Sequence, residues 1–420
     1  MAKPYSVLAG KAVRALARLR GGGSALPGLF VEKIDRDFVA AALAQLPHGV
    51  VLISGTNGKT TTTKMVVELL ESQGMKVFTN RTGSNFSRGV AAALLGEVDA
   101  RGRLVADIAV LELDEAHAVH FVHKVPPRYS LLLNVMRDQL DRFGEIDATA
   151  NMLAEIARAT TDTVVVNRED PRLRIVARTI KARVRYFGLH DSLLSSFPND
   201  DSLHGGDTES DDRPAADVVL ARLGDTATFS LHGKPVTTPL KLQGVYNVFN
   251  AAAALALALA IIGDDVDEPK LIARLADVTP AFGRGEKLVV DGQPCELVLV
   301  KNPSGFRLGL KSFPPEGYAT MIAINDNYAD GRDMSWLWDV DFESLHEGVA
   351  EVTGVRGYDM ALRLQYDDVP VGHVDTNLTR ALANFLAVSA GKPKRIYCTY
   401  TAMLALRREL GKHAKVEVIS

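Results

Sequence analysis

The feature that most constrains this chain is a short hydrophobic strand that runs directly into a glycine-rich loop and then into a helix. The strand is VVLIS, and the segment after it contains Gly55, Thr56, Asn57, Gly58, Lys59, Thr60 and Thr61. Glycines let backbone N–H groups turn inward around a phosphate, and the helix N-terminus adds partial positive charge. In such a loop Lys59 reaches the terminal phosphate oxygens and Thr60 offers its hydroxyl to Mg²⁺. These seven residues are therefore predicted to bind the phosphates of a nucleotide.

Short β-branched segments alternate with longer helical patterns along the chain, which is typical of βαβ units and a parallel sheet. VVLIS is followed by TTTKMVVELLESQG and KVFTN, and further buried strands are expected at 108–112, 129–134 and 163–167. Hairpin-like strands are expected around TATFSLHGKPV, before an Ala-rich helix from about residue 247 to 262. The predicted fold class is α/β.

Composition excludes several classes of protein. Of the 420 residues 47% are hydrophobic, which is too many for a disordered chain, and the length favours two or three domains. The net charge of −3 gives no overall basic field, so no binding to nucleic acid is expected. Cys295 and Cys398 are the only cysteines, and their separation excludes a local four-cysteine zinc site and a disulfide framework. They favour a reducing compartment, and the protein is predicted to be cytoplasmic.

Two segments differ from the rest of the chain. KAVRALARLR, from Lys11 to Arg20, predicts a short basic amphipathic helix that packs on the protein, and a contact with anionic lipid at the inner membrane face stays open. No run of 18 or more uncharged apolar residues indicates a membrane span. The stretch 191–212 holds seven acidic residues and no Lys or Arg, so it is predicted to be a mobile surface insertion.

The motifs together resemble the Mur ligases and folylpolyglutamate synthetases, ATP-dependent enzymes that join a carboxylate to an amine. GTNGKTTTT resembles their phosphate loop, VLELDEA their acidic metal motif, and NVMRDQLDRFGE the motif N-V-x-x-D-H-L-D-R. QGVYNVFNAAAA is similar to their adenine-contacting segment, and FGRGE to the entry to their C-terminal domain. The resemblance implies ATP and Mg²⁺ as cofactors.

The same resemblance implies roles for individual residues. Glu112 takes the position of the glutamate that binds Mg²⁺ with Thr60, since only a metal neutralises two anions during phosphoryl transfer to a carboxylate. Asn247 and Asn250 correspond to residues that hold the adenine, with helix capping as the alternative. Arg284, in FGRGE, completes the implied ATP-binding set.

Departures from the amino-acid-adding Mur ligases are also visible. Gln139 replaces their metal-binding histidine, and the lysine that they carbamylate is replaced near Ala154–Glu155, so a second metal site is not expected. His117, His120 and His123 lie close together in sequence, but their spacing fits no metal site and predicts core or surface histidines.

The C-terminal third resembles a narrower family. KNPSG replaces the usual DYAHNP-like segment, while AINDNYADGRDMSWLWDVDFE and TGVRGYDMALRLQY resemble the C-terminal domain of MurT, the synthetase subunit of lipid II isoglutaminyl synthase. That resemblance covers nearly the whole chain. Its four aspartates, Asp326, Asp330, Asp333 and Asp339, cannot all be buried unpaired. Trp336 and Trp338 are expected to be exposed on a partner surface, with burial of both in the core as the alternative.

The MurT resemblance implies a defined reaction. Such proteins activate the α-carboxylate of D-glutamate in the lipid II stem peptide as an acyl phosphate, and ammonia then gives D-isoglutamine. A separate glutaminase subunit, GatD, supplies the ammonia, and an aspartate of the synthetase completes its Cys-His triad. Asp339 is favoured for this role, followed by Asp333 and Asp330. Many relatives carry a zinc ribbon where this chain has the acidic insertion, so no zinc is expected.

Three domains follow from these comparisons. Residues 1–45 form an N-terminal helix and lead-in, 46–285 a Mur ligase-like central P-loop domain with a parallel sheet, and 286–420 a smaller Rossmann-like α/β C-terminal domain. Two alternatives for the activity remain: an amino-acid-adding ligase acting on murein precursors or folate, and a nucleotide-binding scaffold without catalysis. Retention of Lys59, Thr60 and Glu112 disfavours the scaffold.

Overall fold

A computed structural model describes residues 3–19, 25–80, 87–137, 146–197, 213–242, 244–279 and 284–412. The chain forms two compact units. Unit 1 consists of Met1–Val135, Asp147–Leu242 and Asn247–Thr279, and unit 2 of Met136–Ile146, Gln243–Tyr246 and Pro280–Ser420. Gln139 and residues 198–212 of the acidic insertion lie outside the described residues. The three domain limits expected from the sequence stay predictions.

Unit 1 is built on a nine-stranded sheet with the order β2-β3-β1-β4-β5-β6-β7-β8-β9. Its strands are β1 (Val50–Ser54), β2 (Val77–Thr79), β3 (Ile108–Glu112), β4 (Tyr129–Leu132), β5 (Thr163–Asn167), β6 (Arg183–Leu189), β7 (Val218–Leu223), β8 (Ala227–Leu231) and β9 (Lys234–Thr238). The neighbouring pairs from β2 to β7 are parallel. The predicted hairpin is confirmed, because β8 pairs antiparallel with β9, and β7 pairs antiparallel with β8.

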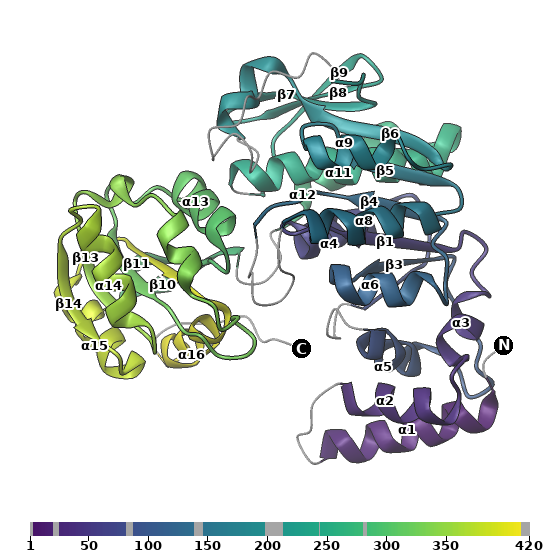
Figure 1. Ribbon diagram of the computed structural model, residues 1–420, viewed down its shortest axis with the longest axis horizontal. Helices are drawn as coiled ribbons and strands as arrows, with labels where there is room; N and C mark the ends of the chain where they lie inside the picture. Colours follow the sequence, from purple (N-terminus) through teal and green to yellow (C-terminus); the bar gives the residue numbers. More distant parts are fainter. Residues whose placement is uncertain are drawn as a thin grey trace. The chain divides into compact units, whose positions relative to one another are not determined.

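Unit 1 also contains helices. Most of them flank the sheet, and the first two of the chain pack on the helix at 87–97 (Figure 1). In the described residues the helices are α1 (Pro4–Leu19), α2 (Ala25–Ile34), α3 (Phe38–Leu43), α4 (Lys59–Ser72), α5 (Ser87–Glu97), α6 (Glu115–Val122), α8 (Ile146–Ala159), α9 (Pro171–Ala177), α11 (Val245–Ile262) and α12 (Glu268–Asp277), with short 3-10 turns η1 (Asp191–Ser196) and η2 (Gly263–Asp265). The predicted basic helix is thus the second half of α1. Helices α8 and α11 each begin with residues of unit 2.

The strand order creates a switch point next to β1. After β1 the chain continues to β2, toward one edge of the sheet and past β3. After β4, the other neighbour of β1, it continues to β5, toward the opposite edge. In open parallel sheets the carboxyl ends of strands at such a reversal form a ligand-binding crevice. The loops after β1, β3 and β4 are therefore the place to look for a site in unit 1.

Helix α11 is long and apolar. Together with η2 it is long and apolar enough to cross a membrane, but 72% of its apolar 18-residue stretch is buried inside the protein. Phe249 in α11 lies 5.2 Å from Phe187 and 5.4 Å from Phe197, measured between ring centroids. The helix therefore serves as the core of unit 1, and the sequence expectation of no membrane span is compatible with it.

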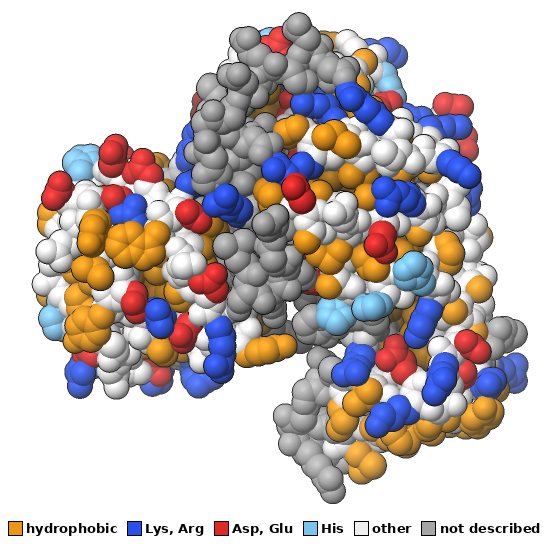
Figure 2. Space-filling view, viewed as in Figure 1, with side chains coloured by type: hydrophobic (Ala, Val, Ile, Leu, Met, Phe, Trp, Pro, Cys, Tyr) orange, Lys and Arg blue, Asp and Glu red, His pale blue; other side chains and the backbone are white. Residues whose placement is uncertain are grey.

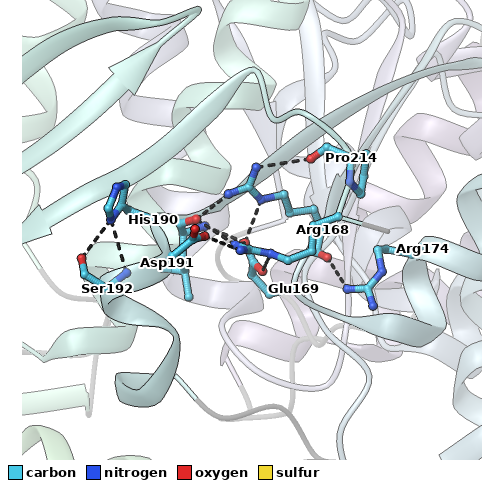
Figure 3. A network of polar contacts seen from close by, with 9 residues as sticks. Arg168, Glu169, Arg174, His190, Asp191, Ser192 and Pro214 are labelled. Atoms are coloured by element: carbon cyan, nitrogen blue, oxygen red, sulfur yellow. Dashed lines mark hydrogen bonds and ion pairs between the residues drawn. The ribbon is translucent and has the colours of Figure 1, made fainter. Parts of the chain in front are cut away.

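A polar network ties the base of the acidic insertion to the sheet (Figure 3). Glu169, after β5, accepts hydrogen bonds from Arg168 Nε at 2.9 Å, from Leu189 N at 2.7 Å and from Arg213 Nε at 2.9 Å. Arg213 also donates from Nη1 to Asp191 at 2.5 Å. Asp191 and Arg213 stand at the two sides of the insertion, and this network links both of them to Glu169 after β5.

Unit 2 contains a six-stranded sheet in the order β10-β11-β15-β12-β13-β14, with β10 antiparallel and the others parallel. Its strands are β10 (Arg284–Val290), β11 (Gln293–Leu299), β12 (Ala319–Ala323), β13 (Val349–Thr353), β14 (Val371–Asp375) and β15 (Lys394–Cys398). The described helices are α13 (Pro303–Ser312), α14 (Gly357–Tyr366), α15 (Leu378–Val388) and α16 (Tyr400–Leu410), with turns η3 (Ser335–Asp339) and η4 (Glu343–Leu345). Two units with large and small parallel sheets confirm the predicted fold class.

The expectation that both tryptophans are exposed is wrong for one of them. Trp336 is only 4% exposed and packs edge-on against Phe306, with ring centroids 6.3 Å apart. Trp338 is 50% exposed and meets Tyr366 edge-on at 5.0 Å. Residues two apart in a 3-10 turn point about 240° apart around its axis, so η3 buries one ring and exposes the other.

Candidate functional site

The segment after β1 has the backbone of a phosphate-binding loop. Gly55 and Gly58 adopt φ values of +134° and +89°, which L side chains rarely tolerate. A Cβ at Gly58 would also lie 2.8 Å from the side-chain amide of Asn250. Helix α4 begins at Lys59, directly after Gly58, so the loop leads into a helix N-terminus. The arrangement suits an anion at the helix N-terminus.

The side chain of Lys59 is buried and paired. Its Nζ donates to the carbonyl of Gly55 at 2.5 Å and lies 3.2 Å from Oε1 of Glu115. The two side chains are 8% and 3% exposed. Glu115 is the second glutamate of the acidic motif VLELDEA and starts α6, and the sequence alone did not give it a role. A buried lysine without a counter-charge is costly, so Glu115 fixes the amine beside the loop.

Thr60 and Glu112 meet across the end of β3. The Thr60 hydroxyl donates to Glu112 Oε1 at 2.8 Å. The backbone of Glu112 is held by the amide of Asn80, which donates to its carbonyl at 2.8 Å and accepts from its N–H at 3.0 Å. The two residues predicted to share Mg²⁺ are therefore brought together, although they are 52 positions apart. Asn80 is a supporting residue that the sequence did not single out.

The end of β4 clamps the loop from the other side. Asn134 accepts from Asn57 N through its side-chain oxygen at 2.9 Å, and it donates from Nδ2 to Asn57 O at 3.0 Å. Its backbone carbonyl accepts from Thr56 N at 3.0 Å. Strand β4 therefore ends at Leu132, two residues before the predicted end, because Asn134 leaves the ladder to hold the loop.

The four remaining predicted ATP-binding residues lie on α4, α11 and β10. Thr61 is buried in the first turn of α4, and Asn250 is 8% exposed against Gly58. Asn247 is half-buried one turn earlier on α11. Arg284 opens β10 opposite Val298, and its side chain lies outside the described residues. Asn250 is thus adjacent to the loop, while contact of either asparagine with adenine stays a prediction.

A second buried carboxyl supports the same edge of the sheet. Asp170 caps α9 by accepting from Leu173 N at 3.0 Å, and it also accepts from Val135 N at 2.6 Å. Burial raises its pKa to about 6, although both backbone N–H bonds act in the opposite direction. Asp170 therefore couples the end of β4, and with it the loop clamp, to α9.

Two of the three clustered histidines lie on the surface. His120 and His123 are exposed, and His123 Nε2 lies 3.8 Å from Glu155, which replaces part of the carbamylated-lysine segment. In the part of the chain that the structure describes, no group of three or more His, Cys, Asp or Glu side chains could hold a metal ion.

The aspartates of unit 2 differ sharply in their surroundings. Asp330 is 2% exposed, accepts from Thr401 N at 2.7 Å and from its hydroxyl at 2.5 Å, and so holds the start of α16. Burial raises the pKa of Asp330, while the Thr401 bonds lower it. Asp333 accepts from the nearby Ser335 N at 2.9 Å. Asp339 is 35% exposed at the side chain, 3.9 Å from Arg137 of the same unit.

Comparison with known proteins extends this geometry. Residues 53–258 match the Mur ligase middle domain family, and residues 299–403 match the MurT ligase C-terminal family. The lipid II isoglutaminyl synthase (glutamine-hydrolyzing) subunit MurT of Streptococcus pneumoniae is 30% identical over 441 residues, covering 96% of each chain. The subunit of the same name from Staphylococcus aureus strain N315 is 31% identical over 390 residues, covering 87% of each.

The fold comparison agrees with the sequence comparison. The MurF ligase of Thermotoga maritima, solved in complex with ADP, superposes with a TM-score of 0.65 at 19% sequence identity, covering 90% of this chain and 84% of MurF. Fold, phosphate loop and middle domain define a Mur ligase-like protein. Within that class, the chain belongs to the MurT family of ligases.

Proposed function

We propose that this chain is the synthetase subunit that amidates the α-carboxylate of D-glutamate in the lipid II stem peptide, using ATP and ammonia from a separate glutaminase. The γ-phosphoryl group of ATP passes to a carboxylate oxygen, giving ADP and an acyl phosphate. The nitrogen lone pair of ammonia then attacks the acyl carbon, phosphate leaves with its bonding electrons, and the amide nitrogen loses a proton. The product is D-isoglutamine.

The observation that carries this proposal is the joint presence of a complete phosphate loop in unit 1 and a MurT C-terminal domain in unit 2. Lys59, held beside the loop by Glu115, supplies the positive charge that a terminal phosphate needs. Asn134 accepts from the N–H groups of Thr56 and Asn57, so the loop backbone is held in place before substrate arrives.

Thr60 and Glu112 suit Mg²⁺. They present a hydroxyl and a carboxylate oxygen within 2.8 Å, and Mg²⁺ prefers such oxygen ligands while keeping waters and phosphate oxygens in its other positions. Bound there, the ion would supply charge neutralisation between the nucleotide phosphate and the substrate carboxylate. The side chain of Asn80 holds the backbone of Glu112, from which that carboxylate extends.

The proposed partner surface lies on unit 2. Its exposed apolar side chains, between 48 and 69% exposed, are Trp338, Val355, Tyr358, Leu362 and Tyr366. Three of them recur every four residues on α14, and Arg363 lies over the Trp338 ring at 5.5 Å. Arg363 is itself buried, and exposed aromatic side chains such as these are typical of binding hot spots.

Asp339 suits the shared-triad role better than Asp330. It directly follows the exposed Trp338, and its carboxylate is accessible, whereas the carboxylate of Asp330 is committed to α16. Asp333 is half-buried and bonded within its own turn. The contacts therefore support the order Asp339, Asp333, Asp330. Because the reaction uses ATP and a membrane-anchored precursor, we place the enzyme in the cytoplasm.

The test is an amidation assay on lipid II with ATP, Mg²⁺ and an ammonium salt, read by the mass of the product and by phosphate release. Turnover with ammonium, and with glutamine only when the glutaminase is present, supports the proposal. Turnover with a free amino acid instead of ammonium would favour an amino-acid-adding ligase. Nucleotide binding without phosphate release would favour a scaffold.

The assay needs a variant that reports on the loop. Lys59→Ala should remove synthesis, since the loss of a charge at the γ-phosphate costs several kcal/mol in the transition state. Lys76→Ala is the matched control, because Lys76 is exposed just before β2, at the amino end of the strands.

A further inference from the structure

The N-terminal hairpin of α1 and α2 exposes an unusual amount of apolar surface. The large hydrophobic side chains involved are Tyr5, Leu8, Leu16, Leu26, Phe30 and Ile34, between 37 and 59% exposed. We call these six residues the hairpin face. On α1 they are spaced three and eight apart, and on α2 four apart, so each helix presents them along one side.

The opposite sides of both helices are packed and therefore fix the orientation of the hairpin face. A Cβ at Gly28 in α2 would lie 2.1 Å from the carbonyl oxygen of Arg88 in α5. A Cβ at Gly10 in α1 would lie 2.7 Å from the side chain of Leu95, which is also in α5. Figure 1 shows α1 and α2 side by side next to α5. The hairpin is thus docked on unit 1 by its inner side, and the hairpin face points outward.

Charge around the hairpin face has the opposite sign to the rest of the chain. Residues 1–37 hold seven Lys and Arg against three Asp and Glu, a net charge of +4 in a chain whose total is −3. Lys33 and Arg36 are exposed, and the buried Asp35 is compensated by Lys3 at 3.8 Å. In Figure 2 hydrophobic and basic side chains gather over this part of the protein.

We propose that the hairpin face is a docking surface for a bilayer that contains anionic phospholipid, with its six apolar side chains entering the interface and Lys33 and Arg36 contacting the headgroups. An apolar stripe bordered by Lys and Arg is the pattern of helices that lie in the membrane interface. Each basic residue near an anionic surface contributes about fivefold in binding. Docking would bring the protein to a lipid-linked substrate, and only this purpose rests on the proposed function.

The experiment is co-flotation of the full chain with vesicles of phosphatidylcholine, and with vesicles in which part of it is replaced by phosphatidylglycerol. We expect binding to the anionic vesicles that weakens as salt is raised. Leu8→Gln, Leu26→Gln and Phe30→Gln combined should lower it by tenfold or more. The matched control combines Val105→Gln, Ile175→Gln and Val388→Gln, three exposed apolar residues elsewhere, and should bind as the wild type does.

A charge variant provides a second, milder test that leaves the apolar side chains in place. Lys33→Gln with Arg36→Gln should weaken binding to anionic vesicles by roughly 25-fold, with an unchanged thermal midpoint. Absence of binding to anionic vesicles, or equal loss in the control variant, overturns the proposal. The proposal is also overturned if the wild type and the triple variant of the hairpin face both fail to bind vesicles, while the wild type forms a concentration-dependent dimer or captures a protein partner and the triple variant does not. Because the assay contains no lipid II and no ATP, its failure leaves the proposed amidation untouched.

Discussion

Lys59 is held by a residue 56 positions away, and this separation limits what the loop motif could reveal about its site. The motif predicts the positions of Lys59, Thr60 and the two glycines, because these residues are neighbours in sequence and form a single turn. It does not reveal that Glu115 and Asn134 hold that turn, since these contacts arise when β3 and β4 align beside β1. The family resemblance predicts that Thr60 and Glu112 share Mg²⁺, which stays a prediction, and their 2.8 Å contact has no local sequence signal.

The ion pair leads to a prediction about Glu115. Glu115→Gln should lower kcat/KM for ATP by tenfold or more, because Lys59 loses its counter-charge and its fixed position. The variant should also unfold at lower temperature, since breaking a buried pair costs about 3 kcal/mol. Steady-state kinetics with ATP as the varied substrate measure the first effect and thermal unfolding the second.

Two comparisons make this prediction specific. Glu115→Asp keeps the charge and should retain more activity than the glutamine variant. Glu71→Gln, an exposed change at the far end of α4, should behave as the wild type does. Wild-type kcat/KM in the Glu115→Gln protein would show that Lys59 needs no such support.

Among the secondary-structure elements, buried strands were the easiest to predict. The predicted strands at 108–112 and 163–167 agree with β3 and β5, because uninterrupted apolar runs in a parallel sheet are covered on both sides. The predictions failed where a side chain has a second task, as at Asn134, or where a turn changes the period, as at Trp336 in η3. The order of strands in the sheet also has no local signal, and the switch point depends on it.

The coupling of α9 to β4 through Asp170 predicts a pH effect on stability. The folded-state pKa of about 6 lies above the unfolded value of 3.8, so the protonated carboxyl stabilises the fold below about pH 4 and that contribution is lost as pH rises through 6. Relative to Asp170→Asn, the wild type should lose up to about 3 kcal/mol of stability between pH 4 and 7. Denaturant unfolding at several pH values measures the difference.

A half-buried aspartate with a lowered pKa supplies the control for that experiment. Arg103 holds the pKa of Asp99 at about 2, so Asp99→Asn should show a constant difference from the wild type between pH 4 and 7. A constant difference for Asp170→Asn as well would mean that Asp170 is ionised throughout this range in the folded protein.

For the whole molecule, cysteine content predicts the metal requirement. Both cysteines are buried, and burial raises the pKa of Cys295 to about 12, which makes its thiol a poor metal ligand. Metal analysis should therefore find no stoichiometric zinc, and activity should survive chelator treatment once Mg²⁺ is restored. One zinc per chain would contradict our interpretation of the acidic insertion.

The division of labour between this chain and its proposed partner gives the last prediction. In the complex with the glutaminase, Asp339→Asn should abolish glutamine-dependent amidation. Asparagine keeps the size of the side chain but favours the wrong tautomer of the partner's histidine, and such a change lowers rates by up to about 10⁴-fold. Amidation at high ammonium concentration should survive, because the phosphate loop and Glu112 lie in unit 1 and are unchanged.

The other two aspartates make this experiment decisive. Asp333→Asn tests the second candidate directly. Asp330→Asn should instead lower the thermal midpoint, because the buried carboxylate that holds the start of α16 accepts two bonds from Thr401. Retention of glutamine hydrolysis by all three variants in the complex would defeat the shared triad. Loss of ammonium-driven synthesis in a variant that keeps its thermal midpoint would assign that aspartate to the synthetase site, since a defect confined to the partner's triad leaves free ammonia able to reach the acyl phosphate.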